Sequence, residues 1–182
     1  VTSQPIAAEI EAGTIRANAM TLHTKARQAL FTNNVAVHLK TRQSEQTSVG
    51  LTGNSNVPVD VVAERLAIDD AANLAIFRGG VIAKQGASNL TGDQLEIRYE
   101  GGAAESATRA EVQTSPTNQA AGALKSITAS GAVVLTSGAG RRVSGDTAMF
   151  DARRDRAEIA GKTVLLSPVS YTHLRAHETS EN

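Results

Sequence analysis

The residues of this sequence best suited to chemistry are two histidines near its C-terminus. His173 and His177 are four residues apart, and Glu178 follows directly. On a helix this spacing places both imidazoles on one face, where they could ligate zinc for metal-assisted hydrolysis. The chain has four histidines and no cysteine, which excludes thiolate metal sites. Whether the pair forms a site depends on the elements around it.

The stretch that carries these histidines resembles a sequencing adapter. Residues 169–179 read VSYTHLRAHET, and they resemble one reading frame of the transposase adapter used in sequencing libraries over eleven consecutive residues. We therefore expect residues 169–182 to be a non-native tail that packs against nothing and binds no metal. The chain also begins at Val1, so we expect an export signal or membrane anchor to lie upstream of it.

The other candidates for catalysis are weak. The segment DARRDR at 151–156 could hold a phosphate, but such alternating charges usually form a solvated turn. The segment GAGRR at 138–142 lacks the lysine and the strand–loop–helix context of a phosphate-binding loop. No G-x-S-x-G motif occurs, and His23 and His38 are expected on the surface. The sequence therefore predicts no enzyme and no cofactor.

The charge balance excludes one class of partner. The chain has 18 basic and 18 acidic residues, so its formal net charge is zero. Affinity for nucleic acid depends on excess positive charge, so we expect no nucleic-acid partner. No apolar run approaches the roughly 18–20 residues that a membrane span needs. A chain of 182 residues is long enough to bury a substantial core.

An internal repeat organises the chain. The segment from Ile15, IRANAMTLHTKARQALFTNNVAV, aligns without gaps with the segment that begins 46 residues later at Val61, VVAERLAIDDAANLAIFRGGVIA. A third copy begins at Val143, and a split copy has its halves at Leu90 and Ile127. The chain is therefore built from one structural unit used several times.

Each unit has the pattern of two antiparallel strands that bend. Apolar or small residues alternate with polar ones, as in a strand with one buried face. Ala63 and Leu66 are three residues apart, which breaks the two-residue alternation. We therefore expect a bulge here that turns both halves of the strand toward one interior. Repetition of this alternation disfavours helix and predicts an all-β meander. The polar stretches 42–58 and 100–123 are expected to be loops.

Two residue types recur at fixed places in the repeat. A glycine inside the second strand marks a bulge or a sharp bend. Aspartate is expected in turns, where its side chain bonds nearby backbone. The glycines are Gly79, Gly131 and Gly161, and the aspartates are Asp69, Asp70, Asp93 and Asp146.

These residues carry a resemblance to a known family. The segments VPVDVVAERLAIDDAANLAIFRGGVIAKQGASNLTGDQLEIRYEGG and SITASGAVVLTSGAGRRVSGDTAMFDARRDRAEIAGKTVLLSP resemble the OstA/LptA domain of lipopolysaccharide export. Residues 10–42, with GTIRANAM and ALFTNNVAVHL, resemble the end of the related LptC domain, although Asn33 stands where the pattern prefers glycine. We thus expect LptC-like strands at 1–42, a linker at 43–56, an OstA/LptA-like domain at 57–168 and the tail at 169–182.

The resemblance implies a fold and a role. The fold would be an open β-jelly roll, a V-shaped half-pipe of antiparallel strands. The role would be to shield the acyl chains of lipopolysaccharide as the lipid crosses the periplasm. The expected partners are lipopolysaccharide and LptC-like and LptD-like domains that join by edge-strand addition, with end-to-end homo-oligomers as a further possibility. The expected location is the periplasm.

A lipid conduit needs one apolar face that lines a groove, and the alternation supplies candidates for it. Small residues such as Ala17, Ala63 and Gly145 fit space for a ligand or close sheet packing. The alternative is a structural or adhesin-like β-repeat whose apolar residues only fill a closed core. The residues predicted to contact lipid are Ile15, Met20, Leu22, Phe31, Val35, Val37, Leu66, Ile68, Phe77, Val81, Leu95, Ile97, Val133, Leu135, Phe150 and Ile159.

Overall fold

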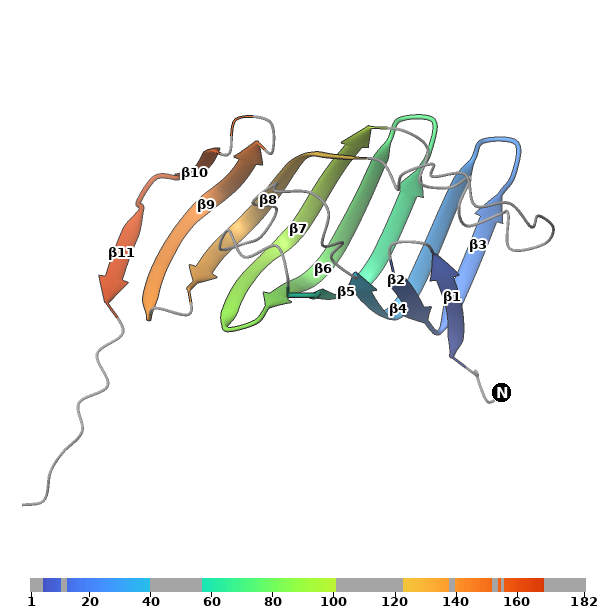
Figure 1. Cartoon of the computed structure of the whole chain (residues 1–182), viewed down its shortest axis with the longest axis horizontal. Coiled ribbons are helices and arrows are strands. Elements are labelled where there is room, and N and C mark those ends of the chain that lie inside the picture. The colour runs from blue at the N-terminus through green and yellow to red at the C-terminus, as the bar shows by residue number, and fades with distance from the viewer. Residues whose placement is uncertain are drawn as a thin grey trace, which may run out of the picture.

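Every element in the described part of the chain is a β-strand. The computed structural model describes residues 5–10, 13–39, 57–100, 123–137, 140–151, 154 and 156–168. Its strands form one open antiparallel sheet with the order β1-β2-β4-β5-β6-β7-β8-β9-β10, while β3 pairs with β4 and β11 with β9 (Figure 1). The strands are β1 (Ile6–Ile10), β2 (Gly13–Ala17), β3 (Ala19–His23), β4 (Gln28–Leu39), β5 (Val59–Asp69), β6 (Leu74–Gln85), β7 (Ser88–Glu100), β8 (Ala123–Thr136), β9 (Arg141–Asp151), β10 (Arg156–Ala160) and β11 (Leu165–Pro168).

This architecture confirms the predicted open all-β fold. The second copy of the repeat forms the hairpin β5–β6, and the two halves of the split copy pair as β7 and β8. Short strands form both edges of the sheet: β2 and β3 share β4 as partner, with β1 outside β2, and β10 and β11 share β9. In the described ranges we find no helix that is long and apolar enough to cross a membrane.

A bend crosses the long strands at one level of the sheet. The register between β4 and β5 shifts between Thr32 and Val35, and equivalent shifts occur in the next four strand pairs. At each shift the extra residue lies on β4, β6 or β8, where two consecutive residues have positive φ. These pairs of residues are Asn33–Asn34, Gly79–Gly80 and Gly131–Ala132.

The residue types at the bend follow from backbone geometry. Glycine adopts positive φ without strain, and asparagine adopts it more readily than other residues, which explains Asn33 in place of glycine. Space is also limited, because a Cβ at Gly79 would lie 2.6 Å from Oε2 of Glu64. A Cβ at Gly131 would lie 2.2 Å from Oδ2 of Asp93. The predicted bends at Gly79 and Gly131 are therefore confirmed.

Two details of this prediction need correction. Gly161 lies in the break between β10 and β11 and not inside a strand. Asp93 and Asp146 lie in the middle of β7 and β9 and not in turns, unlike the pair Asp69–Asp70, which does begin a turn. Asp93 packs against Gly131 of β8, and Asp146 packs against Gly161 just after β10, so each polar side chain is accommodated while its strand continues.

The bend gives the sheet two arms that share one interior. Because each bulge shifts the alternation by one residue, Ala63 and Leu66 are both buried, while Glu64 and Arg65 between them are exposed. We call the half of the sheet that contains β3 and β10 the first arm, and the half that contains β1, β2 and β11 the second arm. The bulge predicted between Ala63 and Leu66 is confirmed.

The predicted segments 1–42 and 57–168 contribute to a single sheet. Strand β4 pairs with β5 along its length, and both belong to one core cluster. The division into LptC-like and OstA/LptA-like parts stays a prediction. The linker 43–56, nearly all of the predicted loop 100–123 and the tail 169–182 lie outside the described residues.

The bend makes a prediction about stability. Ala132 has φ 45°, a conformation that costs a residue with a Cβ roughly 1 kcal/mol or more. Ala132→Gly should therefore raise the free energy of unfolding by about 0.5–1 kcal/mol in guanidinium denaturation. The control Ala67→Gly, at an exposed position of β5, should lower it by a similar amount. Equal losses in both variants would contradict the strained bulge.

Candidate functional site

The inner face of the sheet is a continuous apolar surface. In the first arm, the row of side chains next to the bend crosses eight strands in register, and we call it the floor row. Successive members lie directly opposite one another on neighbouring strands, which places them on one face. The floor row comprises Met20, Phe31, Leu66, Phe77, Leu95, Ala129, Ala148 and Ile159.

A second row lies farther from the bend on the same face of the first arm. We call it the wall row, because its members stand nearer the tips of the strands. It also crosses eight strands without a break in register. The wall row comprises Leu22, Ala29, Ile68, Ala75, Ile97, Ile127, Phe150 and Ala157.

The second arm faces the same interior with rows of its own. Beside the bend, Val35 pairs with Ala63, Val81 with Gly92, and Val133 with Gly145. The next row, which we call the second-arm row, crosses eight strands in the same way. It comprises Ile15, Val37, Val61, Ala83, Leu90, Leu135, Val143 and Leu166.

The structure brings together all sixteen residues predicted to contact lipid, but it does not expose them equally. Each lies in one of these rows, and nine are at most 4% exposed, so they fill a dry interior. Five are partly buried, and Met20 and Leu22 at the β3 edge are 42% and 47% exposed. The nine are Ile15, Phe31, Val35, Val37, Leu66, Phe77, Val81, Leu95 and Val133, and the five are Ile68, Ile97, Leu135, Phe150 and Ile159.

Accessible apolar surface is concentrated in the wall row and at the sheet edges. From Ala29 to Phe150 every wall-row residue is partly exposed, whereas the floor row between β4 and β8 is buried. At the opposite edge from β3, the residues Val164 and Leu166 beside β9 are 47% and 69% exposed. Apolar surface is therefore buried near the bend and along most of the second arm, and it becomes accessible toward the tip of the first arm and at the ends of the sheet.

Several inner-face residues were not among the predicted lipid contacts. Val61, Ala83, Leu90 and Ala129 are buried in the core, and Leu166 is exposed at the edge. Val61 and Ala83 continue the alternation of Ala63 and Val81, so the same two-residue period could have found them. Leu90 and Leu166 stand close to strand ends, where the alternation is short and less diagnostic.

Polar contacts hold the turns at the tip of the first arm. The amide of Asp70 donates to the carbonyl of Arg27 at 3.1 Å, and the amide of Tyr99 donates to the carbonyl of Asn73 at 3.2 Å. The guanidinium of Arg27 also pairs with the buried carboxylate of Asp70. Burial raises the pKa of Tyr99 to about 12, and the negative charges of Asp70 and Asp69 add to the shift. These groups tie the turns before β4 and before β6 to each other and to the end of β7.

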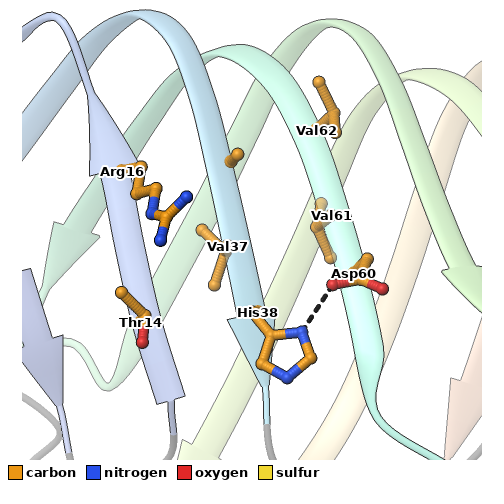
Figure 2. Close-up of a pocket in the computed structure, with 8 residues that line it drawn as sticks. Thr14, Arg16, Val37, His38, Asp60, Val61 and Val62 are labelled. Atoms are coloured by element: carbon orange, nitrogen blue, oxygen red, sulfur yellow. Dashed lines mark hydrogen bonds and ion pairs between the residues drawn. The ribbon is translucent and has the colours of Figure 1, made fainter. Parts of the chain in front are cut away.

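A shallow pocket lies on the outer face, between β2, β4 and β5 (Figure 2). Thr14 and Arg16 line it from β2, and His38 faces Asp60 across β4 and β5, with Nδ1 and Oδ1 2.6 Å apart. Both side chains of this pair are about half exposed, at 47% and 57%. Since His38 and Val37 alternate in direction, this pocket is separate from the apolar inner face.

The two arginine-rich segments differ in their pairing. In the first-arm turn, Arg154 Nη1 lies 3.0 Å from Oδ2 of Asp151, and Arg156 pairs with Glu158. These contacts fit the solvated turn expected for 151–156. Arg141 and Arg142, at the tip of the second arm, form no ion pair with another described residue.

The histidine pair of the tail, His173 and His177, lies outside the described residues. Within the described ranges, no group of three or more His, Cys, Asp or Glu side chains is placed to hold a metal ion. His23 and His38 are exposed, as expected.

Comparison with known proteins finds similarity to a family model and to solved structures. A family model described as "LptA/(LptD N-terminal domain) LPS transport protein" matches residues 60–172. Among solved structures, the chain is similar to LptH of Pseudomonas aeruginosa, described as the LptA-homologous periplasmic component of the lipopolysaccharide transport device. The TM-score is 0.52 at 10% identity, covering 84% of this chain and 92% of LptH, which shows the β-jelly-roll fold. No curated protein sequence matches the chain.

The buried tyrosine allows a test of the first-arm tip. The chain has two tyrosines, so Tyr171→Phe leaves Tyr99 as the only one. In this variant, ultraviolet absorbance should give a pKa of about 12, above the usual value of ~10. Because the unfolded chain loses this proton at lower pH, the free energy of unfolding should fall as pH rises from ~10 to ~12. Tyr99→Phe should remove this fall, and ionisation of Tyr99 at its usual pH would contradict the structure.

Proposed function

The chain belongs to the LptA/LptD N-terminal-domain family of lipopolysaccharide transport proteins, and from this we propose that its inner face shields lipid acyl chains during transport. One observation carries the proposal. The wall row is a continuous, partly exposed apolar surface that stands beside a buried floor and opens at both ends of the sheet. Such a surface offers acyl chains a place out of water.

The energetics of this role need no catalytic group. Each CH₂ group removed from water contributes about 0.8 kcal/mol, so a chain of ten or more carbons supplies ample binding free energy. Open ends also suit transport, because a lipid can enter and leave along the groove. Binding that is spread over many weak contacts lets the lipid move without breaking one strong interaction.

The burial pattern separates two tasks within the predicted lipid contacts. Residues such as Phe77 and Leu95 are inaccessible, so we assign them to holding the arms together. The lipid contacts proper are then the partly exposed wall-row residues, together with the accessible inner-face residues at the two edges. These residues are Met20, Leu22, Ile68, Ile97, Ile127, Phe150, Ile159, Val164 and Leu166.

We further propose that the chain works in the periplasm and joins other Lpt components through its edges. LptH, which shares its fold, is described as a periplasmic component of the transport device. Strands β1 and β3 at one end and β10 and β11 at the other lack a second neighbour among the described residues. Unpaired backbone groups favour strand addition, which would extend the groove into an LptC-like or LptD-like domain or another copy.

The alternative function is a structural β-repeat that binds no lipid. The dry core near the bend favours it, because nine predicted contact residues already have their apolar surface buried by protein. Under this alternative the wall row would only be the margin of a closed core. A test must therefore compare the two faces of one strand.

Phe150 and Met149 on β9 allow such a test. Phe150 belongs to the wall row on the inner face, whereas Met149 points outward and is 46% exposed. A benzophenone amino acid at Phe150 should form a photo-adduct with lipopolysaccharide, while the same amino acid at Met149 should give only background. The adducts can be detected by immunoblotting for lipopolysaccharide.

Circular dichroism of both photo-crosslinking variants would establish that each is folded. Equal adducts from Phe150 and Met149 would indicate non-specific association, and adducts from Met149 alone would place lipid on the outer face. Either result would contradict the shielding function and favour the structural β-repeat.

A further inference from the structure

The tip of the second arm carries a cationic site beside the open end of the groove. Arg141 and Arg142 begin β9, directly after the turn that joins it to β8. The amide of Ser137 donates to the carbonyl of Arg141 at 2.8 Å, and the amide of Gly140 donates to the carbonyl of Ser137 at 3.0 Å. These bonds fix where the backbone of Arg141 stands.

The register of β9 determines which way the two arginines point. Val143 belongs to the second-arm row, between Leu135 and Leu166. Successive residues of a strand alternate in direction, so Arg141 shares the inner face with Val143, and Arg142 points to the outer face. Arg141 therefore stands at the rim of the groove, where the apolar surface is most accessible, beside Leu166 at 69% exposure.

This positive charge is not compensated within the described residues. Arg141 is exposed and forms no ion pair there, and the described residues around it, from Ser137 to Ser144, include no acid. The hydroxyl of Ser137, in the same turn, is buried and finds no hydrogen-bond partner among them. By contrast, Arg154 and Arg156 on the first arm are both neutralised by carboxylates. Among the described residues, the guanidinium of Arg141 on the inner side of this rim therefore has no carboxylate partner.

An amphiphile with an anionic head group fits this arrangement. Guanidinium binds phosphate through charge-assisted, often bidentate hydrogen bonds. A phosphate attached to acyl chains would meet Arg141 while the chains lie on Val143, Leu166 and the wall row. A neutral amphiphile would bury the same apolar area without this contact.

We propose that Arg141 binds a phosphate group of the transported lipid and so selects phosphorylated lipids at the β9–β11 end of the groove. This inference rests on the proposed function, because it needs acyl chains on the inner face. The lipid head group would then lie at the rim of the second arm. The first arm is less suitable, because carboxylates there already pair with Arg154 and Arg156.

The test is equilibrium binding of the full 182-residue chain to two lipids. One is synthetic hexa-acyl lipid A with both phosphates, and the other is the same lipid with both phosphates removed. Arg141→Gln should weaken binding of the phosphorylated lipid about tenfold, the size expected for one charge-assisted contact. Binding of the phosphate-free lipid should be unchanged.

Two control variants separate a contact from general charge. Arg142→Gln removes the neighbouring charge on the outer face, and Arg154→Gln removes a paired charge on the first arm. Each should change the affinity for phosphorylated lipid less than about threefold, because screened charges interact weakly across solvent. Equal effects of Arg141→Gln and Arg142→Gln would overturn the proposal.

The remaining outcomes distinguish the two proposals. If neither lipid binds, the proposed function fails. If both lipids bind the unaltered chain equally and Arg141→Gln changes nothing, the function stands and the phosphate site is overturned.

A competition experiment with inorganic phosphate identifies the source of the ligand. Complete displacement of the lipid by phosphate would show that Arg141 is a general anion site, and this would overturn its assignment to a lipid.

Discussion

The structure depends on a bend made from pairs of residues with positive φ. Each of β4, β6 and β8 has one such pair, and each pair stands opposite a neighbouring strand that has one residue fewer. At the bend the inward residues are four apart on β4, as in Phe31 and Val35, and three apart on β5, as in Leu66 and Ala63. With this bend, one sheet folds its apolar faces toward each other and builds a core without a second sheet.

The same constraint decides what the interior can bind. Near the bend the arms are close, and large side chains such as Phe31 and Phe77 fill the space to low exposure. Toward the tip of the first arm, the wall row keeps part of its apolar area accessible. A groove of this kind has a rigid floor that maintains the fold and an apolar wall that can exchange protein contacts for lipid contacts.

Much of the fold could be predicted from the sequence because the repeat shows the bend several times. The step from Ala63 to Leu66 and the glycines at 79 and 131 predicted the bulge, and the structure has it at those places. Asp93 and Asp146 were misplaced because aspartate favours turns locally, while here a glycine of the neighbouring segment, Gly131 or Gly161, leaves room for it. A contact between neighbouring strands cannot be seen in a local pattern.

The site was harder to predict than the fold. Alternation identifies the inner face, but it does not distinguish Phe77, which is buried, from Phe150, which is partly exposed. That difference comes from the distance to the bend and to the edge of the sheet. The charged segments were also ambiguous, because DARRDR and GAGRR both contain adjacent arginines, and only the structure shows the carboxylate partners of Arg154 and Arg156.

The central claim is that acyl chains lie between the two arms. Nuclear Overhauser effects between acyl protons and methyl groups of the folded protein test it most directly, since they require short distances and no foreign label. We expect contacts from the acyl chains to Ile97 and Ile127 of the wall row, and none to Val62 and Ile82, which are exposed on the outer face. Contacts to Val62 and Ile82 without contacts to the wall row would contradict the account.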